Sequence, residues 1–279
     1  MRSELGLGRD VEGVSAVECL RAVALDVSGV HPLRLAIRMP LMLRQNALLA
    51  TVAVLGALVM QGCATTGARP TVSQQGAVRS ATPVLDANYY ATLDHGIVEE
   101  LNRVRTNPSG YAAVLERDLP YYRGNLFRRP GEESALETRE GTSAVLEAIR
   151  VLRQTPPLPP LRLSAPMSEA AEDHVRDQAP RGLMNHRGTD GTMAWDRVSR
   201  YGEWKKKISE NMTFGPMTPH DVVAALLIDD GISDRGHRKN VLDPEVHLVG
   251  VACGTHKTYR VMCDMVQAGG FIDKEAAQR

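Results

Sequence analysis

The sequence predicts an α+β fold in which helices come first along the chain and a short antiparallel sheet comes last. Apolar residues recur at helical spacing in five segments between residues 88 and 230. Two segments near the C-terminal end flank a short turn containing Gly and Thr, which is typical of a strand pair. No internal repeat is visible, so we expect one domain over residues 89–273 with its own core, followed by a tail over 274–279.

The five helical segments are bounded by residues that commonly start or stop helices. We expect them at residues 88–106, 109–115, 142–154, 164–177 and 218–230. Thr142 or Ser143 is expected to cap the third helix, and Thr218 the last one. Residues 118–141 combine Pro and Gly with several charges and predict a loop or insertion, and residues 182–217 predict loops.

The strand pair carries two cysteines. Residues 249–253 and 259–263 predict strands, and they contain Cys253 and Cys263. Two cysteines facing each other on such a hairpin can form a disulfide in an oxidising compartment, and the alternative is two buried free thiols that pack as small apolar groups. The absence of a CxxC spacing argues against a metal site made from them.

Composition and charge exclude some classes of function. The chain has 33 Lys and Arg against 33 Asp and Glu, so its formal net charge is zero. A protein that binds nucleic acid through bulk phosphate neutralisation would be basic. Aromatic residues make up only 4% of the chain, which argues against a surface that stacks bases. We therefore expect no nucleic-acid partner.

An apolar run ahead of the domain predicts export. Residues 47–60 form a predominantly apolar run without charge, follow a basic residue, and end shortly before Cys63. This pattern resembles a bacterial lipoprotein signal over residues 39–62, in which Cys63 is lipidated and becomes the new N-terminus. The alternatives are a single transmembrane anchor or a plain cleaved secretory signal. Residues 1–38 are then a doubtful leader, with Met39 or Met42 a better start than Met1, and residues 63–88 a flexible tether.

Each of these three alternatives places the domain outside the cytoplasm. With a lipid on Cys63, the chain would be held at a membrane of the cell envelope, at the outer membrane or on the periplasmic face. Ala64 follows the cysteine instead of the Asp that commonly retains lipoproteins in an inner membrane, so the resemblance implies outer-membrane delivery. With a cleaved signal, the protein would be extracellular.

Four short segments carry the residues that could support chemistry. They are MNHRGTDG at 184–191, ISENMTFG at 208–215, RGHRKNVL at 235–242 and VGVACG at 249–254. In this order, and with LNRVR at 101–105 ahead of them, they resemble the CAP superfamily of cysteine-rich secretory, antigen 5 and pathogenesis-related proteins. The resemblance spans residues 91–271.

This resemblance implies an α-β-α sandwich with a surface cleft, lined by two histidines and two acidic residues that can hold a divalent metal. His186 matches the first histidine, Glu210 the Glu of a Gly-Glu-Asn motif whose Gly is replaced by Ser209, and His237 the second histidine. Two imidazoles and a carboxylate are a common zinc ligand set that leaves a position for water, so zinc is the first choice of metal. The alternative is a metal-free cleft in which each histidine is held by a carboxylate.

The second acid of the cleft is Asp229 or Asp230, which are expected to complete the ligand set or to support it from behind. Asn211, Arg238 and Asn240 belong to the same motifs and are expected to hold loop carbonyls near the cleft. The other polar candidates are expected to face solvent or to pair locally; they are His174, Glu203, His220, His247 and His256.

We therefore expect an exported, membrane-tethered binding module whose cleft holds a divalent metal and a lipid or peptide ligand. The alternatives are a metal-dependent hydrolase that uses His186, Glu210 and His237 with metal-activated water, and a structural or interaction module with an inert cleft. The sequence contains neither an HExxH motif nor a serine in a nucleophile-elbow context, which favours the non-enzymatic alternatives.

Overall fold

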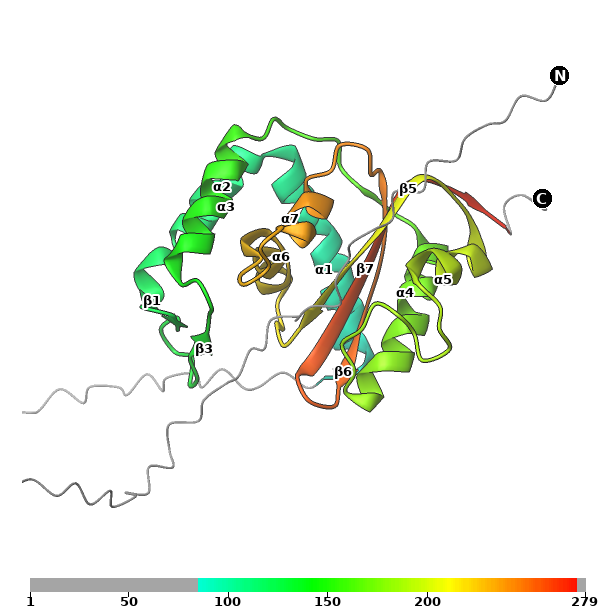
Figure 1. Cartoon of the computed structure of the whole chain (residues 1–279), viewed down its shortest axis with the longest axis horizontal. Coiled ribbons are helices and arrows are strands. Elements are labelled where there is room, and N and C mark those ends of the chain that lie inside the picture. Colours follow the sequence, from blue (N-terminus) through cyan, green and yellow to red (C-terminus); the bar gives the residue numbers. More distant parts are fainter. Residues whose placement is uncertain (1–84, 275–279) are drawn as a thin grey trace, which may run out of the picture. The chain divides into compact units, whose positions relative to one another are not determined.

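The computed structural model describes residues 85–274, in which a four-stranded sheet is covered by helices on both faces (Figure 1). The strand order is β4 (Arg162–Leu163), β6 (Leu248–His256), β7 (Arg260–Asp273) and β5 (Gly202–Phe214). The β4–β6 pair is parallel and the other pairs are antiparallel. The predicted α+β class and α-β-α sandwich are confirmed, while the leader, the signal and Cys63 lie outside the described residues.

Two buried clusters lie on the two faces of the sheet. On one face, Val251 and Met265 pack with apolar residues of α1 (Ala87–Thr106) and α6 (Pro219–Ile228). On the other face, residues such as Ala252 pack against α4 (Ala165–Gln178) and α5 (Ala194–Tyr201). This division follows from the strand, in which consecutive side chains point to opposite faces. At Gly250 an added Cβ would lie 2.2 Å from the backbone carbon of Met167, so glycine lets α4 approach β6 closely.

The first two helices share one capping residue. The Asp86 side chain accepts a hydrogen bond from Tyr89 N (2.8 Å) and starts α1 two residues before the predicted domain boundary. Asn107 ends α1, and its side chain accepts from Gly110 N (3.0 Å) to start α2 (Pro108–Glu116). No helix between residues 85 and 274 is long and apolar enough to cross a membrane.

The later predicted helices form close to their expected bounds. The third, α3 (Thr142–Gln154), has the predicted ends, but its N-cap is Gly141, with φ 57°, and the predicted cap at Thr142 or Ser143 was wrong. Thr218 caps α6 as predicted by accepting from Asp221 N (3.1 Å). The predicted insertion contains a small sheet of β1 (Tyr122–Arg123), β2 (Leu126–Phe127) and β3 (Leu136–Glu137). Short 3₁₀ turns lie at Leu119–Tyr121 and Ala179–Arg181.

Residues 194–214 form regular structure, so the predicted loops were wrong there, while residues 182–193 and 215–217 form loops as predicted. The regular part contains α5 and the thirteen-residue strand β5, and α7 (Gly236–Val241) follows later. Three lysines and an irregularity between Lys205 and Ile208 hide the alternation in the first half of β5, where Lys206 has φ 64°. Charged residues and bulges are common devices on edge strands, because they discourage pairing with another chain.

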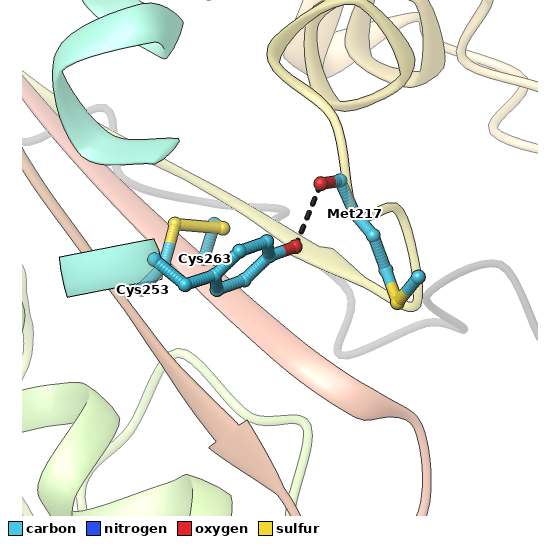
Figure 2. Close-up of a disulfide and its surroundings, with 4 residues drawn as sticks. Met217, Cys253 and Cys263 are labelled. Carbon is cyan, nitrogen blue, oxygen red and sulfur yellow. Dashed lines mark hydrogen bonds between the residues drawn. A yellow bond between two sulfur atoms is a disulfide. The ribbon is translucent and has the colours of Figure 1, made fainter. Parts of the chain in front are cut away.

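The predicted hairpin extends further than expected in both directions. In the register of β6 and β7, Cys253 lies opposite Cys263, and the two form a disulfide (Figure 2). The disulfide alternative is therefore the one that the structure contains. The hydrogen bond drawn beside it runs from Tyr89 Oη to the carbonyl oxygen of Met217 (2.7 Å) and ties α1 to the segment before α6.

Candidate functional site

Glu210 is the centre of the first of two histidine–carboxylate pairs. It lies on β5, and its side chain is 4% exposed. One carboxylate oxygen is 2.7 Å from His186 Nδ1, and the other accepts a hydrogen bond from Arg197 on α5. Arg197 also donates to the carbonyl oxygens of His186 (3.3 Å) and Thr192 (3.0 Å), which folds the loop after α4 onto β5.

The charge of Glu210 is held by these partners. Burial acts to raise the pKa of Glu210, but the hydrogen bond with His186 and the positive charge of Arg197 outweigh it and keep the pKa below its usual range. Glu210 is therefore an ionised carboxylate in a buried position. It orients the His186 ring through Nδ1, and that ring makes no other hydrogen bond within residues 85–274.

Behind Glu210 lie two fully buried groups that sequence reasoning missed. His174 on α4 and Asp264 on β7 are both 0% exposed, so of the two alternatives expected for His174, exposure to solvent and local pairing, the structure contains the second. His174 Nε2 is 2.8 Å from Asn185 O, while His174 Nδ1 and both Asp264 carboxylate oxygens have no hydrogen-bond partner in the described part of the chain. One ligand atom from each of His174, Glu210 and Asp264 lies within 4.8 Å of the other two, a possible metal-binding triad.

A periodicity signal for both groups was present in the sequence. His174 follows Met167 by seven residues and Ala170 by four, which places it on the buried face of α4. Asp264 alternates with Met262 and Val266 on β7 and shares their face. Burial raises the pKa of Asp264 well above its usual range, with a further contribution from the Glu210 charge, and burial lowers the pKa of His174.

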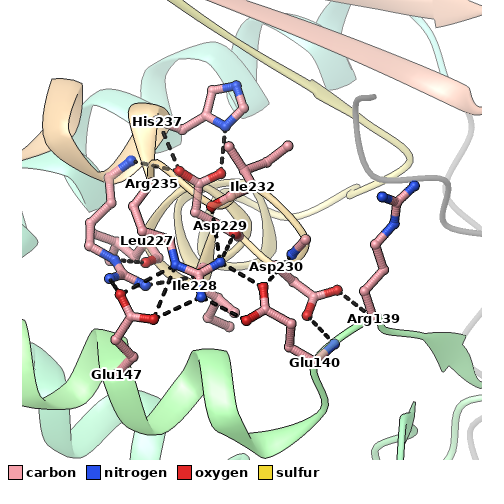
Figure 3. A network of polar contacts seen from close by, with 12 residues as sticks. Arg139, Glu140, Glu147, Leu227, Ile228, Asp229, Asp230, Ile232, Arg235 and His237 are labelled. Carbon is pink, nitrogen blue, oxygen red and sulfur yellow. Dashed lines mark hydrogen bonds and ion pairs between the residues drawn. The ribbon is translucent and has the colours of Figure 1, made fainter. Parts of the chain in front are cut away.

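The second pair joins His237, on the first turn of α7, to Asp229 at the end of α6 (Figure 3). His237 Nδ1 is 2.7 Å from one oxygen of Asp229, and the backbone N–H of His237 donates to the other (2.9 Å). Asp229 is fully buried and has φ 54°, which turns the chain sharply between the two helices. Asp229 therefore starts α7 and orients the His237 ring in one interaction.

Asp230, the other predicted acid, points elsewhere. Its carboxylate accepts hydrogen bonds from the backbone N–H groups of Arg139 (2.6 Å) and Glu140 (2.8 Å), as Figure 3 shows. Asp230 thus holds the segment before α3 and makes no hydrogen bond or ion pair with either histidine among the described residues. Of the two acids that the sequence left open, Asp229 is the one that meets a histidine.

The motif residues with an expected structural role bind backbone and each other. Arg238 donates to the carbonyl oxygens of Leu227 and Ile228 and pairs with Glu147 on α3 (2.7 Å). Asn211 Nδ2 donates to His237 O (3.4 Å), and Asn240 Nδ2 donates to Asn211 Oδ1 (2.8 Å). These contacts fasten α7 to β5 at the residue that follows Glu210.

The structure thus brings the predicted site residues together as two pairs. Adjacent residues of a strand point to opposite faces, so Glu210 and Asn211 hold the two histidine segments from the two faces of β5. Within residues 85–274, no hydrogen bond or ion pair joins the His186–Glu210 pair to the His237–Asp229 pair. Each ring has its Nδ1 on a carboxylate, so Nε2 is the nitrogen left for a ligand.

A small apolar cavity lies beside His237. It has a volume of about 100 Å³, and it is bounded by β1, β3, β5 and α6. Apolar side chains form most of its wall; they include Tyr122, Leu136, Met212, Phe214, Leu226 and Ile228. His237 supplies an imidazole to the same wall, so the cavity combines apolar contact with a few polar groups.

The segment that carries both histidine–carboxylate pairs matches a known family. Residues 146–265, which include His186, Glu210 and His237, match the family model of the Cysteine-rich secretory protein family, CAP. The uncharacterized protein YkwD of Bacillus subtilis (strain 168) is 29% identical over 122 residues, which cover 44% of this chain and 44% of that protein. The match therefore spans less than half the length of this relative. The chain carries a CAP superfamily domain.

Solved structures with partial similarity were also found. An outer surface protein from Borrelia burgdorferi has 14% sequence identity and a TM-score of 0.35, with 40% of this chain and 78% of that chain covered. An extracellular protein containing a SCP domain from Bacillus anthracis str. Ames has 19% identity and a TM-score of 0.32, with 44% and 38% covered.

Proposed function

We propose that this protein is an exported, membrane-tethered binding module that receives an apolar part of a lipid or peptide ligand in the cavity beside His237. The observation that carries the proposal is the wall of that cavity, which is apolar except for a few polar groups, His237 among them. At about 100 Å³ it is smaller than the ~300–1,000 Å³ of pockets that enclose a whole small molecule. It suits a single side chain or the end of an acyl chain.

His237 gives the cavity a means of selecting its ligand. Asp229 accepts from Nδ1 and fixes the ring, so Nε2 is the nitrogen left to meet a ligand. A ligand with a polar group next to its apolar part would satisfy both the wall and the imidazole: a hydroxyl or amide N–H would donate to the neutral ring, and a carboxylate would accept from the protonated ring. The Asp229 contact also limits the entropy lost on binding, because the ring is already oriented.

The proposed location rests on the N-terminal sequence and on the disulfide. An apolar run followed by Cys63 is typical of a lipoprotein signal, and residues 63–84 would connect the lipid to the described domain. Disulfides such as Cys253–Cys263 persist in oxidising compartments and are rare in the cytosol. Both features support export and attachment at the cell envelope.

A divalent metal in the cleft is a second candidate ligand, favoured by the carboxylate behind each ring. Metal-ligating histidines usually donate their other ring N–H to a carboxylate, as His186 does to Glu210 and His237 to Asp229. Either histidine would hold the ion through Nε2, with Glu210 orienting the ring of His186 and Asp229 the ring of His237. When bound, such an ion polarises a ligand carbonyl or a water molecule.

The ligand proposal is tested by titrating the full chain with sodium octanoate in a calorimeter. Leu136→Trp should weaken binding at least tenfold because the larger ring fills the cavity, and Leu136 is exposed enough (39%) to accept the change. Leu163→Trp on β4 is the matched control, since Leu163 is also exposed and lies outside the cavity wall. Equal heats for wild type and both variants, or no binding of octanoate and of apolar peptides, would contradict the proposal.

The tether is tested separately with Cys63→Ser. We expect the variant protein to leave the membrane fraction or to accumulate as a precursor of higher mass. Fractionation and intact mass spectrometry of both proteins provide the measurement. An unchanged membrane fraction with an unchanged mass would favour a transmembrane anchor over lipidation.

A further inference from the structure

We propose that this chain binds a divalent transition-metal ion at a buried site between α4, β5 and β7, through His174 Nδ1 and one carboxylate oxygen each from Glu210 and Asp264. This site lies behind the His186–Glu210 pair and does not include His237. The inference is independent of the proposed ligand cavity, because the cavity wall shares no residue with the triad.

Unpartnered atoms at this site are the first observation. His174 and Asp264 are 0% exposed, and His174 Nδ1 and both oxygens of Asp264 have no hydrogen-bond partner within residues 85–274. Buried polar atoms are nearly always paired, because burial without a partner forfeits their hydration. Three unpaired acceptor atoms on two residues that lie beside a buried carboxylate are an arrangement that a cation would satisfy.

Distances within the group are the second observation. Its three ligand atoms lie within 4.8 Å of one another. Zinc lies about 2.0–2.2 Å from imidazole and carboxylate ligands, so two ligands of one ion are at most about 4.4 Å apart. Shifts of a few tenths of an ångström would therefore bring all three atoms into contact with one ion. One imidazole and two carboxylates suit zinc, manganese or iron, and a water molecule would complete the coordination.

The surrounding contacts fix the ligands in the form that a metal needs. His174 Nε2 is 2.8 Å from Asn185 O and must donate to it, which leaves the lone pair on Nδ1. His186 and Arg197 hold Glu210 from the outside through its two oxygens. Such outer partners are usual around metal ligands, because they set the tautomer and the orientation of each ligand.

The alternative occupant of the site is a proton. Two buried carboxyl groups beside one arginine leave an excess negative charge, so without a metal Asp264 retains a proton next to Glu210. A divalent ion would replace that proton, which would leave for the solvent. Asp264→Asn imitates the protonated form in shape and charge, and so it should fold normally while binding the ion poorly.

The experiment uses the full chain without a polyhistidine tag, purified in detergent and stripped with a chelator. Wild type, Asp264→Asn, His174→Gln and His237→Gln are dialysed against Zn²⁺ or Mn²⁺ and then against metal-free buffer, and the bound metal is measured by mass spectrometry. We expect one equivalent of one of these ions in wild type and in His237→Gln, and at least tenfold less in Asp264→Asn and His174→Gln. Circular dichroism checks that each variant is folded.

Two results would overturn the proposal. Loss of the metal in His237→Gln with retention in Asp264→Asn would place the ion in the histidine cleft. No retained ion in any folded protein would assign the unpaired atoms to a proton alone. If His174→Gln does not fold, Asp264→Asn decides the matter, and an anomalous-scattering peak in a crystal of the loaded protein gives the position of the ion directly. Neither result bears on octanoate binding at the cavity, so the two proposals fail independently.

Discussion

The two faces of the sheet bury polar groups in different ways. On the α1 face, the side chain of Arg105 is fully buried and donates to four backbone carbonyls, those of Pro159, Val241, Asp243 and Val246, at 2.9–3.1 Å. On the α4 face, Glu210 is paired, but His174 Nδ1 and the Asp264 carboxylate have no partner in the described chain. Both faces therefore contain buried charge, and the carboxyl group that is fully buried with both oxygens unpaired lies on the α4 face.

This difference separates a structural role from a candidate site. A buried group whose hydrogen bonds are all made within the protein holds segments together, as Arg105 joins α1 to the loops around α7 and β6. A buried group with open lone pairs costs stability unless something else occupies them. If this distinction holds, removing a fully paired group should cost more stability than removing an incompletely paired one.

Arg105→Met should be the most damaging of these substitutions. The apolar stem is kept, but four carbonyl oxygens lose their donor, two of them buried and two partly buried, at about 1–3 kcal/mol for each buried group left unpaired. We expect a loss of about 4 kcal/mol or more in the free energy of unfolding, measured by urea denaturation, or no folded protein. Arg105→Lys, which restores the charge with fewer donors, should recover part of the loss. A cost below about 1 kcal/mol for Arg105→Met would show that water replaces the side chain.

Removal of the disulfide should have the next largest effect. Cys253 and Cys263 close a loop with a sequence separation of 10. Loop-closure entropy for such a loop corresponds to about 3 kcal/mol in the unfolded state. The Cys253→Ala, Cys263→Ala double variant should lose about that much in urea denaturation. The variant should match the reduced wild-type protein; a clear difference between them would mean that packing of the sulfur atoms, and not the cross-link, stabilises the hairpin.

The helices were predictable because their signals are local. The apolar spacing that predicts α1, α3 and α6 lies within each helix. The residues that bound these helices, Asn107, Gly141 and Thr218, are next to them in the sequence. The strand β5 was not predictable in the same way. It is an edge strand whose lysine-rich half breaks the alternation, and it forms because β7 pairs with it along its length.

The site was predictable only in part, for a related reason. His186, Glu210 and His237 stand in motifs and Asp229 lies near the end of a predicted helix, but which carboxylate meets which histidine depends on the positions of β5, α6 and α7 in space. His174 and Asp264 lie in no such motif, and a polar residue on an apolar face of a helix or strand is usually read as an exception. Their importance becomes visible only when their partners, and the lack of them, can be counted.

Asp264→Asn should change stability in the opposite direction from the two variants above. Burial raises the pKa of Asp264, so the folded protein holds a proton there that the unfolded chain has lost at neutral pH. A raised carboxyl pKa means that stability falls as pH rises above the unfolded value of about 3.9. In metal-free buffer the asparagine variant should therefore be more stable than wild type at pH 7, with the difference shrinking toward pH 4. A loss of stability at pH 7 would mean that Asp264 is ionised and paired in the folded protein.

The smallest effect concerns Asp94 on α1, which tests whether one open carboxyl oxygen on the α1 face behaves like Asp264. Asp94 Oδ1 has no hydrogen-bond partner among residues 85–274, and burial raises the pKa of Asp94 to about 7, with a backbone hydrogen bond from Cys253 opposing the shift. Because the folded pKa is raised, the Asp94 contribution to stability is favourable below the unfolded value near pH 3.9 and is lost as pH rises through about 7.

The ¹³C carboxyl resonance of Asp94 should titrate with a midpoint near 7. That titration should be missing in Asp94→Asn, whose stability should vary less between pH 5 and 8. Because Asp94 is less deeply buried than Asp264, water can reach it, and the gain in stability from Asp94→Asn at pH 8 should be smaller than the gain from Asp264→Asn. A midpoint near 4 would mean that the backbone hydrogen bond outweighs burial at Asp94. The tested carboxyl groups of the two faces would then also differ, because Asp94 on the α1 face would be ionised at neutral pH and Asp264 on the α4 face would be protonated.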